Sequence, residues 1–417
     1  MIVEFRVKNF CCLRDEQVLS FVPTTDKTLE ESNIYDTDVL SEPHLLRTAA
    51  IYGANASGKS TVIMALQTML NIVCIKFIEG TESFIPTIPF LLDNESQNNP
   101  TSFELTFIYN GFKYQYGISC TRMKIIEEYL FKYNTKRKST LFDRLYDNKS
   151  ESYIYKFGKD ISTERITWRK ATSDKVCFLS TAAQLNSKIF LPIWLYLKEK
   201  YLIINKDNKP HMWFILSKLY KNIKKQERIC SFLRSADISI DSIKINKIPI
   251  RNNTKYTIFD DLTNEYILYF NHKKIDNTQM LLPSALESSG TLRLFIYLNY
   301  MFDILDKGGV FIVDEIDASL HPMLVQHIIK LFQSKNNNSH GAQLLVSTHD
   351  VYILQNDPPI LRNDQIWFIE KNGDQASELY SLSDFTKLKE NNYLKYYMHG
   401  KLGGVPAIRE WEDVYEG

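Results

Sequence analysis

Gly53-Ala-Asn-Ala-Ser-Gly-Lys-Ser60 is a complete G-x-x-x-x-G-K-[ST] loop, and this stretch decides the fold. Backbone N–H groups can wrap a phosphate chain only where side chains leave room, so the loop needs glycines at 53 and 58. Lys59 is expected to reach the β- and γ-phosphates, and the Ser60 hydroxyl is expected to bind Mg²⁺. The predicted nucleotide-binding residues are Gly53, Ala54, Asn55, Ala56, Ser57, Gly58, Lys59, Ser60 and Thr61.

The sequence on either side of the loop fits the same interpretation. Arg47-Thr-Ala-Ala-Ile-Tyr52 is typical of a short buried strand, and residues 61–70 are apolar at helical spacing. The N-terminus of such a helix directs the positive end of its dipole at a phosphate. A glycine turn without function would rarely satisfy all these conditions together, so the chain is predicted to bind a nucleoside triphosphate.

Composition limits the class of protein. The 417 residues are 44% hydrophobic and 13% aromatic, which indicates a folded chain rather than a disordered one. The 50 Lys and Arg balance 49 Asp and Glu, so net charge gives no indication of a nucleic-acid or membrane partner. The six cysteines form no C-x-x-C pair, and no apolar run reaches membrane-spanning length. We therefore expect a cytoplasmic protein without a membrane segment.

A second motif supplies carboxylates. Gly309-Val-Phe-Ile-Val-Asp-Glu315 is an apolar strand that ends in two acids. Asp314 is expected to join Ser60 in holding Mg²⁺, while Glu315 is expected to orient the water that attacks the γ-phosphate. An Asp-Glu pair after a strand can also be an exposed turn, but the upstream phosphate loop favours function.

Residues 344–350, Leu-Leu-Val-Ser-Thr-His-Asp, form another apolar strand that brings His349 to the same sheet edge. An imidazole there could contact the γ-phosphate, although a lone histidine after a strand is usually a polar edge residue. The predicted catalytic residues are Glu315, His349 and Lys59.

Glu287-Ser-Ser-Gly-Thr291 introduces an apolar helix, and we call these residues the signature segment. Its small residues and helix N-terminus form a second potential phosphate site, while an ordinary capped helix start is the simpler interpretation.

In this order the motifs resemble the ABC-type ATPases of the structural-maintenance and recombination-repair group, and most closely the RloA-like (AbiL-type) abortive-infection ATPases. The resemblance implies an α/β, P-loop ABC-type ATPase fold with a mixed sheet, an antiparallel β-subdomain and a mainly helical insertion. It further implies that Ser288 and Gly290 of one subunit cap the γ-phosphate held by Lys59 and Ser60 of another, with ATP and Mg²⁺ enclosed in a head-to-tail homodimer. A higher homo-oligomer is the alternative assembly. The stretches that carry the resemblance are Phe5–Phe10, Tyr52–Thr61, the signature segment, Ala318–Pro322 and Gly403–Pro406.

The sequence departs from that group at two points. The signature segment is Ser-Ser-Gly-Thr rather than Leu-Ser-Gly-Gly-Gln, and Cys11 stands where the group often has a basic residue. The glutamine expected to touch Mg²⁺ is not placed by the sequence, and Gln97 and Gln115 remain open alternatives.

Three regions are expected along the chain. Residues 1–159 would carry the P-loop and an antiparallel hairpin around Asn110-Gly111, and residues 275–417 would complete the ATPase domain in α/β fashion. Residues 160–274 would form an insertion for recognition or docking, with helices at 185–201 and 211–233 followed by strands to 274.

As implied by the resemblance, the leading hypothesis is an ATP-hydrolysing sensor or switch for a separately encoded effector in antiphage defence. The alternative is a DNA repair or recombination ATPase of the RecF or SMC type. Its DNA contacts would come from Lys136-Arg-Lys138 and from Lys218, Lys221, Lys225 and Arg228, although a solvated helix face explains the second set as well.

Overall fold

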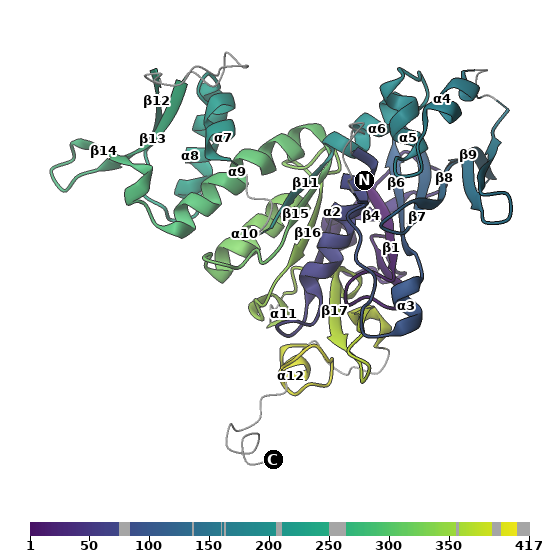
Figure 1. Ribbon diagram of the computed structural model, residues 1–417. Helices are drawn as coiled ribbons and strands as arrows, with labels where there is room; N and C mark the ends of the chain where they lie inside the picture. Colours follow the sequence, from purple (N-terminus) through teal and green to yellow (C-terminus); the bar gives the residue numbers. More distant parts are fainter. Residues whose placement is uncertain are drawn as a thin grey trace.

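The computed structural model describes residues 1–74, 84–135, 137–159, 161, 164–205, 211–249, 264–355, 358–385 and 393–406. Its centre is a six-stranded sheet in the order β11-β15-β16-β5-β17-β18 (Figure 1). All strands but β18 run parallel, so their carboxyl ends meet at one edge, where an α/β sheet binds its ligands. The strands are β5 (Thr48–Tyr52), β11 (Tyr201–Ile204), β15 (Val310–Val313), β16 (Gln343–Ser347), β17 (Ile366–Lys371) and β18 (Ser377–Ser381).

A second, seven-stranded antiparallel sheet lies beside the first, in the order β10-β9-β8-β7-β6-β1-β2 (Figure 1). The predicted hairpin at Asn110-Gly111 is confirmed, because both residues have positive φ and join β6 to β7. The strands are β1 (Ile2–Lys8), β2 (Gln17–Ser20), β6 (Thr101–Tyr109), β7 (Phe112–Cys120), β8 (Ile125–Asn134), β9 (Arg137–Asp147) and β10 (Ser152–Phe157).

Helix α2 (Lys59–Cys74) follows the P-loop and packs against β1 and β6 of the antiparallel sheet, so one apolar core joins the two sheets. The same core takes in α5 and α6. A second core lies on the opposite face of the central sheet and includes α9 and α10. The larger helices are α4 (Arg165–Ala171), α5 (Phe178–Gln184), α6 (Phe190–Glu199), α7 (Met212–Leu219), α8 (Ile223–Ser235), α9 (Ser289–Lys307) and α10 (Pro322–Gln333).

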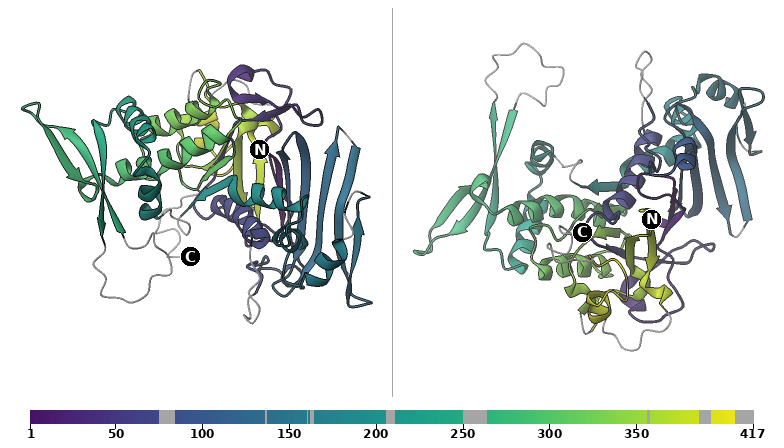
Figure 2. Two further views of the ribbon diagram at one scale, coloured as in Figure 1. Left: turned by 90° about the horizontal axis from the view of Figure 1, so that it is seen from above. Right: turned by 60° about the horizontal axis from the view of Figure 1, so that its bottom comes forward.

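A third, three-stranded sheet projects from the side of the molecule opposite the antiparallel sheet, beyond α7 and α8 (Figures 1 and 2). It consists of β12 (Ser242–Pro249), β13 (Asn264–Lys273) and β14 (Gln279–Pro283), and leads through a 3₁₀ turn into α9. The remaining short elements are α1 (Glu30–Asn33), β3 (Ile34–Asp36), β4 (His44–Leu46), α3 (Asn94–Asn98), η2 (Ser284–Leu286), α11 (Tyr352–Gln355), η3 (Asn363–Gln365), η4 (Leu382–Asp384) and α12 (Tyr393–Met398).

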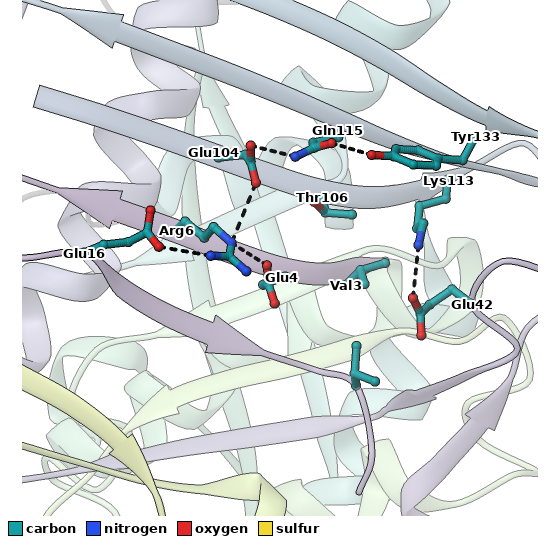
Figure 3. Close-up of a pocket in the computed structure, with 11 residues that line it drawn as sticks. Val3, Glu4, Arg6, Glu16, Glu42, Glu104, Thr106, Lys113, Gln115 and Tyr133 are labelled. Atoms are coloured by element: carbon teal, nitrogen blue, oxygen red, sulfur yellow. Dashed lines mark hydrogen bonds and ion pairs between the residues drawn. The ribbon is translucent and has the colours of Figure 1, made fainter. Parts of the chain in front are cut away.

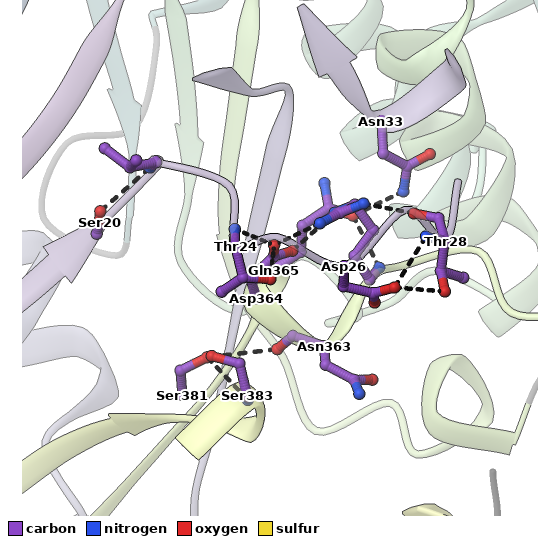
Figure 4. Close-up of polar contacts among 12 residues, drawn as sticks. Ser20, Thr24, Asp26, Thr28, Asn33, Asn363, Asp364, Gln365, Ser381 and Ser383 are labelled. Atoms are coloured by element: carbon purple, nitrogen blue, oxygen red, sulfur yellow. Dashed lines mark hydrogen bonds and ion pairs between the residues drawn. The ribbon is translucent and has the colours of Figure 1, made fainter. Parts of the chain in front are cut away.

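A buried polar cluster fastens the segment after β2 to the start of β17 (Figure 4). Asp364 accepts hydrogen bonds from the Thr24 N–H (2.8 Å) and hydroxyl (2.9 Å), and it pairs with the buried guanidinium of Arg362 (2.7 Å). Gln365 donates to the Thr48 carbonyl of β5 (3.0 Å) and accepts from Asn33 (2.6 Å). This cluster therefore fixes β17 next to the strand that carries the P-loop.

Two predicted helices are wrong in their extent. The helix predicted over 211–233 is broken into α7 and α8, because Asn222 caps a new helix by accepting a hydrogen bond from the Lys225 N–H (3.1 Å). The helix predicted over 185–201 is only α6, since Leu185 ends α5 and Asn186 turns the chain with a φ of 62°. Tyr201 already belongs to β11.

The three-part division of the chain stays a prediction. Strand β11 lies within the range assigned to the insertion, yet it is an edge strand of the central sheet. Within residues 160–274, the described elements that belong neither to the central sheet nor to the helices packed with it are α7, α8, β12 and β13. In the described part of the chain, no helix has both the length and the apolar character needed to cross a membrane.

Candidate nucleotide-binding site

The P-loop leaves the fully buried strand β5 and enters α2, as the sequence predicts. A Cβ atom on Gly53 would lie 2.5 Å from the Ile369 carbonyl oxygen, and Gly58 has a φ of 114°. Neither position accommodates a side chain without distortion. The loop therefore has its glycines because the backbone is closely surrounded, which is the condition for backbone N–H groups to face a phosphate chain.

Lys59 is buried, and its Nζ donates to the carbonyls of Gly53 (2.7 Å) and Ala54 (3.0 Å) across the loop. Burial lowers the pKa of the lysine, and the nearby Asp314 and Glu315 carboxylates oppose that shift. The Ser57 hydroxyl is buried and has no hydrogen-bond partner among the residues that the structure describes. A cationic amine and an unsatisfied hydroxyl in one narrow loop fit a polyanionic ligand such as triphosphate.

The two carboxylates after β15 are held by one serine of the neighbouring strand. Ser347 Oγ donates to Asp314 (2.5 Å) and accepts from the Glu315 N–H (2.7 Å). Glu315 has a φ of 53°, and its side chain is exposed. The two hydrogen bonds of Ser347 thus make the side chains of Asp314 and Glu315 point in different directions. Glu315 lines the cavity beside the P-loop.

His349 lies at the carboxyl end of β16, where its N–H donates to Asp317 (3.2 Å). The pKa of its ring lies below the usual 6.5, because the surrounding protein partly desolvates it and the Lys59 ammonium repels a second positive charge. At neutral pH the ring is therefore uncharged, so one ring nitrogen donates a hydrogen bond and the other accepts one.

One cavity of about 320 Å³ joins most of the predicted residues. Glu315 follows β15 and His349 follows β16, and both meet the P-loop there because β15, β16 and β5 are successive parallel strands of the sheet. Gly53 and Ala54 are outside the described lining of this cavity, but their carbonyls accept hydrogen bonds from Lys59, which is part of it. Sequence reasoning missed three further lining residues, Cys11, Cys12 and Lys371. The predicted residues that line the cavity are Asn55, Ala56, Ser57, Gly58, Lys59, Ser60, Thr61, Glu315 and His349.

A second cavity of about 450 Å³ shares Ser60 and Glu315 with the first, and it brings Asp314 to Ser60. A hydroxyl and a carboxylate at a common cavity match the oxygen ligands that Mg²⁺ requires. Asn205, at the end of β11, also lines this cavity, and its side chain donates to Gln67 of α2 (2.7 Å). The apolar run Tyr201–Ile204, which Asn205 follows, is typical of a short buried strand. The helix predicted over 185–201 includes Tyr201 and therefore hides this pattern.

The signature segment starts α9 as an exposed, capped helix end. Ser288 Oγ accepts a hydrogen bond from the Thr291 N–H (3.0 Å), and Ser288 itself is exposed. A Cβ atom on Gly290 would lie 2.5 Å from the Ser319 carbonyl oxygen, so this glycine allows α9 to approach the turn after Glu315. Among the described residues, the lining of the P-loop cavity includes neither Ser288 nor Gly290.

Neither glutamine proposed for Mg²⁺ lines either of these cavities. Gln97 donates to the Leu91 carbonyl (2.8 Å). Gln115 lies on β7 in a cavity of about 470 Å³ on the antiparallel sheet, where it donates to Glu104 (2.7 Å) (Figure 3). The charges there are paired internally, with Arg6 between Glu4 (2.6 Å) and Glu16 (3.0 Å).

The basic residues considered for DNA binding do not form one helix face, because α7 and α8 are separate helices. Lys225 pairs with Asp303 (2.7 Å) and Arg228 with Asp306 (2.7 Å), both on α9. These two cations are therefore neutralised within the chain. Lys136 lies outside the described residues, while Lys138 stacks over the Phe131 ring (3.4 Å).

The end of the described chain also reaches the P-loop. A Cβ atom on Gly404 would lie 3.3 Å from the Gly53 Cα, and the Gly404 N–H donates to Glu370 of β17 (3.1 Å). Tyr397 of α12 donates to the Gly404 carbonyl (3.2 Å) and packs edge-on against Tyr52, the residue before the P-loop. The Gly-Gly-Val-Pro segment noted in the sequence is therefore part of the wall behind the loop.

Residues 49–355 match the family model described as "AAA domain, putative AbiEii toxin, Type IV TA system". The chain belongs to this family. The matched range runs from β5 to α11 and includes the P-loop, the signature segment, both carboxylates and His349. The predicted membership of an AAA family of ATPases is confirmed, and the chain is an AAA-type ATPase with an α/β fold.

A curated relative of this AAA-domain protein is the retron Vc95 probable ATPase of Vibrio cholerae serotype O1 biovar El Tor. The two are 27% identical over 174 residues, which span 37% of this chain and 30% of the relative. The match therefore covers under a third of the relative's length.

Among solved structures, the SMC head domain from Thermotoga maritima aligns with a TM-score of 0.41 and 14% identity, covering 91% of this chain and 98% of that one. The Pyrococcus furiosus Smc head domain with an extended coiled coil, bound to the C-terminal domain of ScpA, aligns with a TM-score of 0.37 and 13% identity. That alignment covers 96% of this chain and 99% of the Smc chain.

Proposed function

We propose that the protein is a Mg²⁺-dependent ATP hydrolase whose nucleotide site is completed by a second copy of the chain, and that this assembly switches a separate effector in antiphage defence. The observation that carries the ATPase part is the single cavity shared by the P-loop, Glu315 and His349. These groups come from three adjacent parallel strands, so the fold itself holds them together.

Each group has a distinct part in the proposed reaction. The loop's N–H groups and Lys59 bind and orient the phosphates, while Ser60 and Asp314 are the groups that would hold Mg²⁺. The bound metal would offset the negative charge of the phosphates. Glu315 accepts a hydrogen bond from the attacking water and orients it, and the uncharged His349 ring contacts the γ-phosphate.

The dimer part of the proposal rests on the exposed signature segment. Ser288 caps an outward-facing helix N-terminus, which can receive a phosphate from a second copy. Neither Ser288 nor Gly290 belongs to the described lining of the chain's own P-loop cavity. A site completed in this way would make dimer formation depend on nucleotide.

The defence part rests on the resemblance to abortive-infection ATPases, on the AbiEii description of the family, and on the similarity to a retron ATPase. We propose that the third sheet with α7 and α8 is the recognition or docking module. Strand β14 leads through the 3₁₀ turn η2 into the signature segment, so a partner bound to the third sheet can act on the ATPase through a short covalent path.

Glu315→Gln tests the proposed chemistry. The substitution keeps the shape of the side chain but removes the base, so we expect ATP turnover to fall by about a hundredfold or more while ATP binding is retained. Mass measurement of the variant with Mg²⁺ and ATP should show a stable dimer. Turnover at the normal rate would exclude Glu315 as the residue that activates water.

The wild-type protein should be assayed in parallel with and without added DNA. Turnover that is indifferent to DNA agrees with an effector switch, whereas strong stimulation by DNA would favour a repair ATPase. Lys59→Ala is the matched control, since it should lose tight nucleotide binding and so show neither turnover nor ATP-dependent assembly.

A further inference from the structure

The P-loop cavity contains a cation that the proposed mechanism does not use. Besides Lys59, its described lining includes Lys371, the last residue of β17. Strand β17 is the parallel neighbour of β5 on the side opposite β16. Lys371 therefore approaches the loop from the flank opposite Glu315 and His349.

The backbone around Lys371 is fixed against the P-loop. In the β17–β18 ladder Lys371 is paired with Ser377, whose Oγ donates to the Ser57 carbonyl (2.6 Å) and whose N–H donates to the Cys12 carbonyl (2.8 Å). A Cβ atom on Gly58 would lie 2.8 Å from the same Ser377 Oγ. The β17–β18 hairpin thus touches the loop at Ser57 and Gly58.

The ammonium group of Lys371 is available to a ligand. The residue is exposed, and the described part of the chain shows no ion pair for it. Successive residues of a strand point to opposite faces, so the neighbouring carboxylate of Glu370 points away from Lys371. Glu370 is engaged instead by the Gly404 N–H (3.1 Å).

The position along the loop indicates which part of a nucleotide Lys371 meets. In a P-loop the backbone N–H groups of the loop cradle the α- and β-phosphates, while the lysine reaches the β- and γ-phosphates. Ser377, the strand partner of Lys371, lies beside Gly58, and the Cys12 sulfur on the same flank lies 3.3 Å from the Thr61 hydroxyl. Glu315 and His349, by contrast, belong to the γ-phosphate end of the proposed site.

We propose that Lys371 is a nucleotide-binding residue that pairs with the α- and β-phosphates of the bound nucleotide. The inference rests on the proposed function of the cavity as an ATP site. An ammonium makes a charge-assisted hydrogen bond with phosphate, and it neutralises charge that Lys59 alone leaves in place. The contact serves ADP and ATP alike, because both carry these phosphates.

Binding of ATP and of ADP to Lys371→Ala tests the proposal. We expect both affinities to fall roughly tenfold or more, which corresponds to losing one hydrogen bond between charged groups. Lys371→Arg should retain most of the affinity, because the guanidinium also binds phosphate. The salt dependence of binding should become shallower in Lys371→Ala, since one ion pair with the ligand is missing.

Lys335→Ala is the matched control, because it removes one exposed positive charge outside the lining of the P-loop cavity. It should bind both nucleotides as the wild type does. Melting of each variant without nucleotide checks that the fold is intact.

The outcomes separate this inference from the proposed function. A wild-type protein that binds no nucleotide would overturn both. Wild-type binding together with equal binding by Lys371→Ala would overturn only the role of Lys371. A loss confined to ATP, with ADP binding unchanged, would also overturn it, since the lysine would then act at the γ-phosphate.

Discussion

Glu315 adopts a backbone conformation that residues with side chains rarely take, with a φ of 53°. Such a conformation costs about 1–3 kcal/mol and persists only where the surroundings enforce it. Here Ser347 enforces it by accepting the Glu315 N–H while donating to Asp314. A glycine would relieve this strain but would remove the carboxylate, so the position keeps a strained acid at the cavity.

The titration of His349 gives a prediction for pH dependence. Its pKa in the folded chain lies below 6.5, so as the pH falls through 6.5 the unfolded chain takes up a proton first. The wild type should therefore lose stability relative to His349→Gln between about pH 7.5 and about pH 5.5. The loss should be small, because the exposed ring is screened by solvent.

Urea unfolding of both proteins across that pH range measures the effect. A stability difference that stays constant with pH, or that grows in favour of the wild type as the pH falls, would contradict the lowered pKa. ATP should shrink or reverse the difference if the ring contacts the γ-phosphate, because the negative phosphate favours the protonated ring and raises its pKa.

At this scale, motifs with fixed spacing could be predicted and isolated residues could not. Gly53–Ser60 and Asp314-Glu315 are contiguous, so each could be recognised by its own pattern. Cys12, Asn205 and Lys371 reach the two cavities only through contacts between distant parts of the chain, and none of them belongs to a motif that predicts a role in binding. The roles of the predicted residues themselves remain predictions for the experiments above.

Between the antiparallel sheet and α5, a buried carboxylate performs the function of a helix cap. Glu128 of β8 accepts hydrogen bonds from the N–H groups of Phe178 (2.6 Å) and Leu179 (3.0 Å), at the positive end of α5. Arg144 of β9 lies 3.5 Å away and donates to the Val176 carbonyl (2.8 Å). Burial raises the pKa of Glu128, while Arg144 and these N–H groups favour its charged form.

Glu128→Gln should destabilise the protein by about 3–5 kcal/mol, because it leaves the buried Arg144 guanidinium without its counter-charge. The midpoint of urea unfolding measures this loss. The double variant Glu128→Leu with Arg144→Met serves as the control and should recover much of the stability, since no unpaired charge remains.

If Glu128→Gln were as stable as the wild type, the pair of Glu128 and Arg144 would contribute nothing to the attachment of α5. ATP affinity at a temperature where the variant is folded should be unchanged, because neither residue lines the P-loop cavity.

Elements whose own residues carry a turn or spacing pattern were predicted well. Elements that depend on pairing with a distant strand or on a single capping residue were not. The hairpin at Asn110-Gly111 follows from turn chemistry, and the helix expected from the apolar spacing of residues 61–70 is α2. Strand β11 has only four residues, and its neighbour β15 lies more than a hundred positions further along the chain. The break between α7 and α8 depends on the single cap at Asn222.

For the whole molecule, the central question is whether one chain or two build the site. Ser288→Arg should spare ATP binding, since Ser288 is outside the described lining of the P-loop cavity, but it should block hydrolysis if a second copy must dock. The loss of the Ser288 cap itself should cost only about 1 kcal/mol.

Mixing Ser288→Arg with Lys59→Ala tests the arrangement directly. In a head-to-tail dimer, one of the two sites in a mixed pair combines an intact P-loop with an intact signature segment. Activity should then return in an equal mixture, up to about half of the wild-type value, because each mixed dimer has one working site of two. A mixture as inactive as its components would indicate that each chain works alone.

The wall of the nucleotide site is drawn from widely separated parts of the chain, from Cys12 through the P-loop to Ser377 and Gly404. Strand β5 emerges early from the ribosome, but both of its neighbours, β16 and β17, are translated about three hundred residues later. A nascent chain therefore has an unpaired P-loop strand for most of its synthesis and no assembled site. Polypeptides released before residue 366 lack β17 and cannot hold the loop as the full chain does, so interrupted translation yields inactive fragments.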